Sequence, residues 1–160
     1  MSAVVGQPAP GFELDGTDGT DAGRRRYSSA EFLGSPLVVA FYPGDNTPVC
    51  TRQLNSYTRD IDAFRDVGAQ VVAISPQSVE SHESFSCNQG GFAFPLLADE
   101  DKAVASSWGV LGPLGFYRRS AFVLDAEGIV RYAHRAVAGL TFRGTDELVD
   151  AVRATQRSEP

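Results

Sequence analysis

The stretch LVVAFYPGDNTPVCT, residues 37–51, decides the fold of this chain. It begins with the apolar run LVVAFY, rich in β-branched and aromatic residues, which is typical of a strand buried on both faces. Pro43 and Gly44 end that strand. Thr47 is a good N-cap and Pro48 a good first helical residue, so the sequence predicts a buried strand that leads through a short loop into a helix.

The segments that follow predict a β-α-β unit. Apolar residues recur at spacings of three, four and three at Leu54, Tyr57, Ile61 and Phe64. This spacing favours one amphipathic helix that ends near Gly68. An apolar run at 71–74 then predicts a second buried strand, parallel to the first because a helix connects the two.

The rest of the chain continues the alternation of strands and helices. The predicted elements are a helix over 78–88, a strand over 94–97, a helix over 101–108, a strand over 120–124, a turn at 125–128 into a strand over 129–134, and a C-terminal helix from 145. This order indicates an α/β protein with a thioredoxin-like fold, a central mixed β-sheet with helices on both faces. With 160 residues, we expect a single domain over 1–160.

Composition narrows the function classes. The formal net charge of −6 argues against nucleic-acid or anionic-lipid partners. The first residues resemble no signal peptide and no apolar run approaches the length of a membrane span, so we expect a soluble, cytoplasmic protein. The basic cluster at 24–26 is interpreted as a solvated strand or loop without a function.

In a reducing compartment the two cysteines, Cys50 and Cys87, are more often reactive or inert than permanently bridged.

Cys50 falls at about the third position of the predicted helix. Unpaired backbone N–H groups and the positive end of the helix dipole favour a thiolate there, and the thiolate is the nucleophilic form. A second interpretation stays open at this point. Cys50 is also in phase with Leu54, Tyr57 and Ile61, so it could be a small buried hydrophobic residue.

The pattern P-x-x-x-T-x-x-C at Pro43, Thr47 and Cys50 resembles the active-site signature of the peroxiredoxins. The surrounding FYPGDNTPVCT is similar to the bacterioferritin-comigratory or Q subfamily. The resemblance continues in the family's order through VGQPAPGFEL at 5–14, SVESHESF at 78–85 with FPLLAD at 94–99, and RSAFVLDAEGIV at 119–130.

The resemblance implies a thiol peroxidase in which Cys50 is the peroxidatic residue and becomes a sulfenic acid. It implies that Thr47 supplies a hydroxyl and that Pro43 shields the pocket. The family pattern R-x-x-F-[VI]-[LI]-D assigns the cation of the site to Arg119 rather than to Arg118, which is then expected to be an exposed or gate-like charge. The expected substrates are hydrogen peroxide or organic hydroperoxides, and neither a metal nor an organic cofactor is implied.

Many members of the subfamily carry a resolving cysteine five residues after the peroxidatic one, where this chain has Asn55. The resemblance therefore assigns Cys87, on the predicted helix 78–88, as an intramolecular resolving cysteine, with a thioredoxin-like dithiol as reductant and a monomer as the expected state. There are two alternatives. One is a one-cysteine enzyme in which Cys87 is incidental and has no catalytic role, and the other is a peroxide-sensing, redox-regulated binding module. No spacing among the Cys and His residues indicates a zinc site. His82 is expected on a helix surface and His134 on a strand.

Overall fold

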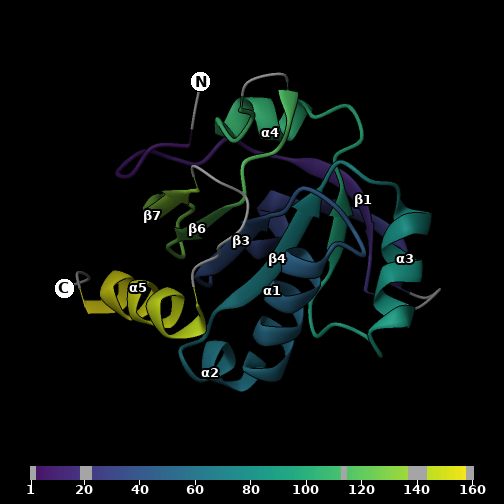
Figure 1. Cartoon of the computed structure of the whole chain (residues 1–160). Helices are drawn as coiled ribbons and strands as arrows, with labels where there is room; N and C mark the ends of the chain where they lie inside the picture. Colours follow the sequence, from purple (N-terminus) through teal and green to yellow (C-terminus); the bar gives the residue numbers. More distant parts are fainter. Residues whose placement is uncertain (1–2, 19–22, 113–114, 137–143, 158–160) are drawn as a thin grey trace.

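A seven-stranded mixed sheet forms the centre of the molecule, with the spatial order β2-β1-β5-β4-β3-β6-β7 (Figure 1). The computed structural model describes residues 3–18, 23–112, 115–136 and 144–157. The strands are β1 Glu13–Thr17, β2 Arg25–Ser28, β3 Leu37–Phe41, β4 Gln70–Ser75, β5 Leu96–Ala98, β6 Ser120–Leu124 and β7 Val130–Arg135. The helices are the 3-10 helix η2 Ser29–Phe32 and α1 Pro48–Arg59, α2 Ile61–Asp66, α3 Val79–Asn88, α4 Ala103–Trp108 and α5 Thr145–Arg157.

The three strands predicted to be buried lie in the middle of this sheet. β3 pairs parallel with β4 and antiparallel with β6, and every residue of β3 and β6 is buried. Successive side chains of a strand point to opposite faces, so Val38 and Ala40 belong to one core and Val39 and Phe41 to the other. The predicted β-α-β unit and its parallel pairing are confirmed.

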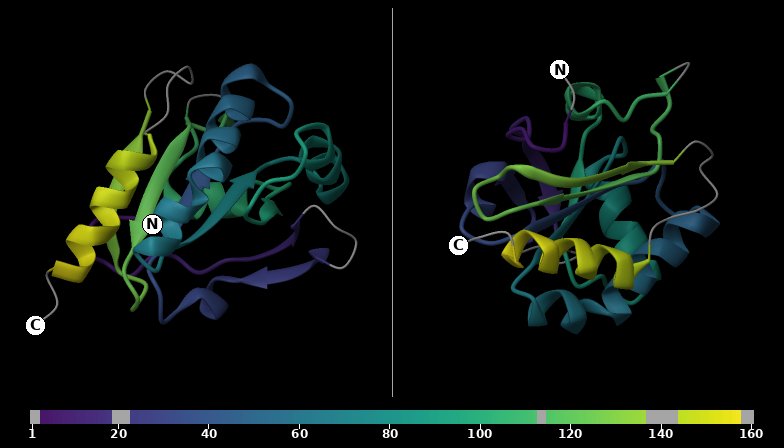
Figure 2. Two further views of the ribbon diagram at one scale, coloured as in Figure 1. Left: turned by 90° about the horizontal axis from the view of Figure 1, so that it is seen from below. Right: turned by 90° about the vertical axis from the view of Figure 1, so that its left-hand side faces the viewer.

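Helices cover both faces of the sheet, as predicted (Figure 2). One core receives Leu54 of α1, Phe64 of α2, Phe85 of α3 and Leu148 of α5. The other core receives Trp108 of α4, together with residues of η2 and of the N-terminal segment. Among the described helices, none is long and apolar enough to cross a membrane.

The single helix predicted from the spacing 54, 57, 61 and 64 is wrong, because the segment forms two helices. α1 ends at Arg59 and α2 begins at Ile61, with Asp60 between them at φ −100° and ψ 19°. Phe64 is buried on the same side of the sheet as Leu54. The break keeps the apolar residues in phase, and hydrophobic periodicity therefore does not reveal it.

The sequence did not predict the β1–β2 hairpin, and β1 also pairs antiparallel with β5. Both hairpin strands carry charged residues on an exposed face, including Arg26, whose guanidinium lies 3.3 Å from the carboxylate of Asp15. The cluster at 24–26 is solvent-exposed, as interpreted from the sequence, and it forms part of a strand.

Candidate active site

Cys50 is the third residue of α1 and is completely buried. Thr47 is the N-cap, and the first intrahelical hydrogen bond runs from the Thr51 N–H to the Thr47 carbonyl at 2.9 Å. The N–H groups of Val49 and Cys50 come before this bond, so they have no intrahelical acceptor. The sulfur therefore lies at the positive end of the α1 dipole, where a negative charge is stabilised.

A buried arginine contacts this sulfur. The Nη1 of Arg119 donates to Cys50 Sγ at 3.1 Å and to Oε1 of Gln53 at 2.7 Å, and Arg119 is only 3% exposed. Gln53 is itself buried and donates through Nε2 to the Tyr57 hydroxyl at 3.3 Å. One turn of α1 thus presents both the sulfur and an amide acceptor that orients the guanidinium.

The adjacent Arg118 points elsewhere. Its guanidinium donates to the backbone carbonyls of Ala136 at 3.2 Å and Arg135 at 3.3 Å, and the side chain is half-buried rather than exposed. The two arginines diverge because neighbouring residues in an extended segment face opposite sides. The structure brings Arg119, and not Arg118, to Cys50.

The turn 43–47 connects β3 to α1. Pro43 and Thr47 lie on its exposed side. Thr47 occupies the N-cap position, but its hydroxyl makes no cap hydrogen bond and donates instead to the Gly44 carbonyl at 2.8 Å. Its hydrogen is therefore already used, and the oxygen is left to act as an acceptor. Asn46 takes the left-handed conformation, with φ 60°, that closes this turn.

A buried polar cluster beneath this turn was missed by the sequence interpretation. The carboxylate of Asp45 accepts hydrogen bonds from the Tyr42 hydroxyl and the Ser81 hydroxyl, each at 2.7 Å, and pairs with His82 Nδ1 at 2.7 Å. The expectation that His82 lies on a helix surface is wrong, because it is completely buried against β5. Burial, followed by the negative charge of Asp45, raises the pKa of Tyr42 well above its ordinary value.

Cys87 has different surroundings from Cys50. It is exposed in the last turn of α3 and does not lie near Cys50. Two side-chain hydrogen bonds connect the residues after it to the region around Cys50, from Asn88 to Asn46 at 3.3 Å and from Asn55 to Gln89 at 2.8 Å. The end of α3 is therefore attached to both the turn 43–47 and the middle of α1.

Comparison with known proteins identifies the family. The profile of the AhpC/TSA family matches residues 5–133, which include the two cysteines and Arg119. The chain belongs to this family of peroxiredoxins. This peroxiredoxin is 33% identical over 98% of its length to a protein of the Clostridium pasteurianum rubredoxin operon that is named as a peroxiredoxin, covering 91% of that protein. It is 37% identical to the chloroplastic peroxiredoxin Q of Oryza sativa subsp. japonica, over 81% of this chain and 58% of that one.

Solved structures agree on the fold. Mycobacterium bovis AhpC superposes with a TM-score of 0.88 at 25% identity, over 100% of this chain and 96% of that one. The bacterioferritin comigratory protein of Xanthomonas campestris gives a TM-score of 0.78 at 31% identity, over 89% of this chain and 90% of that one. The predicted thioredoxin-like fold is thus confirmed, and the peroxiredoxin has thiol peroxidase activity.

Proposed function

We propose that this peroxiredoxin reduces hydrogen peroxide and organic hydroperoxides with Cys50, resolves the product with Cys87 of the same chain, and is reduced by a thioredoxin-like dithiol. The observation that carries the proposal is the 3.1 Å contact between Arg119 Nη1 and Cys50 Sγ in a site where both side chains are buried. A cation held there favours the thiolate and remains fixed during the reaction.

In the first step, the Cys50 thiolate attacks one oxygen of ROOH. A sulfur–oxygen bond forms, the O–O bond breaks, and RO⁻ leaves and takes a proton from water to become ROH. Negative charge moves toward the leaving oxygen, so donors aimed there lower the barrier. Arg119 and the N–H groups of Val49 and Cys50 are the donors that the fold supplies, and the Thr47 oxygen is available to accept the hydrogen of the peroxide.

Pro43 has no N–H group and a fixed φ, which suits it to shape the solvent side of this pocket. Substrates with an organic group are included because the Xanthomonas campestris relative is described in terms of its alkyl peroxide reduction activity.

In the second step, the Cys87 thiolate attacks the sulfur of the Cys50 sulfenic acid; the S–S bond forms, the S–O bond breaks, and the hydroxide that leaves takes a proton from solvent to become water. A disulfide needs Cα atoms within about 7 Å, whereas the ordered Cys87 does not lie near the buried Cys50. Local opening of the first turn of α1 and the last turn of α3 is therefore required. Gly90 and Gly91, with φ 78° and 96°, follow α3 and allow its end to rearrange at low cost.

The reductant then exchanges its dithiol for the Cys50–Cys87 disulfide. Exposure of Cys87 supports attack by another protein, because thiol–disulfide exchange requires access to a sulfur. Since both cysteines belong to one chain, a monomer suffices for this cycle. The separation of the two cysteines also supports a one-cysteine enzyme, in which an external thiol reduces the sulfenic acid directly.

The substitution Cys87→Ser separates these two mechanisms. We expect it to keep the first reduction of peroxide, to abolish thioredoxin-dependent turnover, and to leave Cys50 open to oxidation to sulfinic acid. Non-reducing peptide mapping after one equivalent of peroxide shows the Cys50–Cys87 link in the unmodified protein. Ser84→Ala, on an exposed position of the same helix, is the matched control. Undiminished turnover in Cys87→Ser, or a Cys50–Cys50 link between chains, contradicts the proposal.

A further inference from the structure

A buried carboxylate, in addition to the exposed Asn88–Asn46 hydrogen bond, fixes the turn 43–47 to α3. Asp45, in the turn, accepts hydrogen bonds from Ser81 and pairs with His82, both in the first half of α3. The backbone N–H of Asp45 also donates to the side chain of Gln77, just before that helix. The carboxylate is 1% exposed and the imidazole is fully buried. Asp45, Ser81 and His82 are called the latch below.

His82 is hydrogen-bonded at both ring nitrogens. Nδ1 lies 2.7 Å from Oδ2 of Asp45, and Nε2 lies 2.9 Å from the carbonyl oxygen of Leu97. A carbonyl can only accept, so Nε2 carries a hydrogen, and a second hydrogen lies between Nδ1 and Asp45. The hydroxyls of Tyr42 and Ser81 also donate to the Asp45 oxygens, so three side chains hold this carboxyl group. The latch is therefore a buried, hydrogen-bonded His82–Asp45 pair.

We propose that the His82–Asp45 pair holds the peroxidatic turn and α3 closed, and that its strength sets how oxidised Cys50 divides between disulfide formation and further oxidation. The second part rests on the proposed resolving role of Cys87. His82 and Asp45 are positioning residues in this proposal, because they act on Cys50 through the turn and the helix.

Two reactions of the Cys50 sulfenic acid compete. Attack by the Cys87 thiolate gives the disulfide and hydroxide, which takes a proton from solvent to become water, and this attack requires the turn and α3 to open. Reaction with a second ROOH gives the sulfinic acid and ROH, and it depends on Arg119 remaining beside Cys50, as in the closed form. A weaker latch therefore favours the disulfide.

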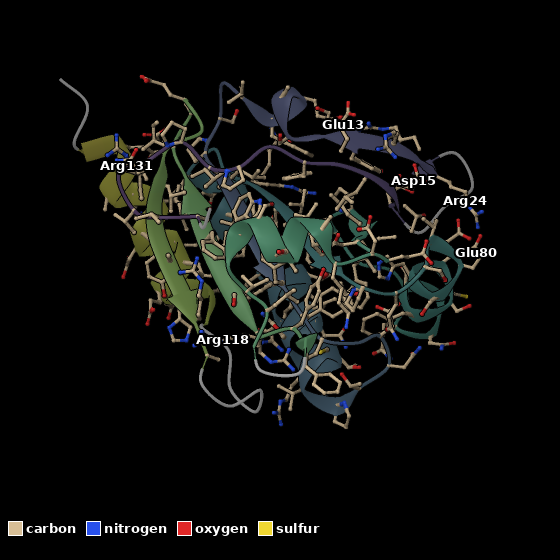
Figure 3. All side chains as sticks on the ribbon, turned by 90° about the horizontal axis from the view of Figure 1, so that it is seen from above. Glu13, Asp15, Arg24, Glu80, Arg118 and Arg131 are labelled. Atoms are coloured by element: carbon tan, nitrogen blue, oxygen red, sulfur yellow. The ribbon has the colours of Figure 1, made fainter. Side chains whose placement is uncertain are left out.

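A second attachment of α3 provides an internal comparison. On the outer side of α3, Arg24 pairs with Glu83 and lies 3.4 Å from Glu80, at the rim where the β1–β2 hairpin meets this helix (Figure 3). Arg24 and Glu80 are exposed, and exposed pairs contribute little. Breaking the buried His82–Asp45 pair costs more, because it leaves a polar group in the interior without its hydrogen-bond partner.

The first experiment compares His82→Phe, Asp45→Asn and the control Arg24→Ala in the reduced protein. We expect amide hydrogens of residues 43–50 and 79–88 to exchange at least about tenfold faster in His82→Phe, an intermediate increase in Asp45→Asn, and no change in Arg24→Ala. Asp45→Asn keeps an amide that can donate to a neutral His82, so it removes the charge while retaining the shape. Unchanged exchange in His82→Phe, or an equal increase in Arg24→Ala, overturns the latch.

The second experiment measures the peroxide concentration that converts half of Cys50 to sulfinic acid during turnover with thioredoxin, read by intact mass. We expect this concentration to rise about tenfold in His82→Phe and less in Asp45→Asn. Val152→Ala, a buried change in the distant α5, controls for general loss of stability. If Val152→Ala raises the concentration as much at equal loss of thermal stability, the latch has no specific role.

Nitrogen NMR of His82 tests the pair directly. In the unmodified protein Nε2 should carry a hydrogen and Nδ1 should show a second hydrogen bond, and the Nδ1 signal should change in Asp45→Asn. An Nδ1 signal that is the same in both proteins contradicts the pair. If peptide mapping shows no Cys50–Cys87 disulfide, the proposed function fails, whereas the exchange and NMR results still decide whether the latch exists.

Discussion

Cys50 and Cys87 occupy opposite ends of their helices and opposite environments. Cys50 is buried at the start of α1, where free N–H groups and Arg119 surround the sulfur. Cys87 is exposed in the last turn of α3, where the carbonyl end of the helix disfavours a nearby anion. The same chemical group is therefore buried beside a cation at one position and open to solvent at the other, and these surroundings agree with the different roles proposed for Cys50 and Cys87.

The largest expected effect comes from removing the positive charge of Arg119 beside Cys50, which should make the surroundings of Cys50 more like those of Cys87. We expect Arg119→Met to slow peroxide reduction by about 100-fold or more, because loss of one fixed donor to a developing oxyanion costs about 3 kcal/mol. Stopped-flow measurement of the reaction of Cys50 with peroxide gives the rate.

The matched control is Arg118→Met, which removes contacts to Ala136 and Arg135 but none to Cys50. We expect it to change the rate by less than about threefold, which corresponds to less than about 0.7 kcal/mol. Alkylation of the exposed Cys87 should be unchanged in both variants. The reverse ranking of the two arginines contradicts the assignment of Arg119.

A smaller loss of rate is expected from substitution of Gln53. It tests whether this side chain orients the Arg119 guanidinium toward Cys50. Gln53→Leu removes the acceptor that holds Arg119 Nη1 at 2.7 Å, and we expect about a tenfold loss of rate, equivalent to about 1.4 kcal/mol. Gln53→Glu keeps an acceptor at this position and should retain most of the rate. Equal losses in both variants would mean that the amide does more than orient Arg119.

The smallest effect concerns the free energy of unfolding at alkaline pH. Of the two helices that carry the cysteines, α1 contains a tyrosine, Tyr57, and α3 contains none. Burial raises the pKa of Tyr57 to about 12, despite the hydrogen bond from Gln53. In the unfolded chain a tyrosine titrates at about 10, so stability from Tyr57 is complete below that pH and is lost as the pH rises toward 12. At pH 10.5 the loss is about 0.8 kcal/mol.

Urea unfolding at pH 8 and pH 10.5 measures this loss. In Tyr57→Phe the free energy of unfolding should decrease by about 0.8 kcal/mol less between these two pH values than in the unmodified protein. Tyr27→Phe, in the hairpin strand β2, is a comparison at a second tyrosine whose pKa burial also raises, so it too should reduce the decrease. An identical decrease in Tyr57→Phe and the unmodified protein would show that Tyr57 titrates normally in the folded state.

Local patterns in the sequence were sufficient for the central elements. The strand at β3, the start of α1 after Thr47, and α3 after Ser78 follow from apolar runs and capping residues within a few positions. The helical break at Asp60 and the β1–β2 hairpin at the edge of the sheet were not predicted. An in-phase break leaves the apolar spacing intact, and charged strands such as β1 and β2 are fixed by their partners rather than by their own pattern.

For the site, the sequence by itself determined which cysteine stands at a helix start and, through the family pattern, which arginine to expect beside it. Only the tertiary structure decided that Gln53 orients Arg119 and that His82 is buried as the partner of Asp45. These contacts join residues from separate elements, and a sequence pattern records only neighbours along one element. A buried histidine and a surface histidine look alike on a helix until the facing carboxylate and carbonyl are in place.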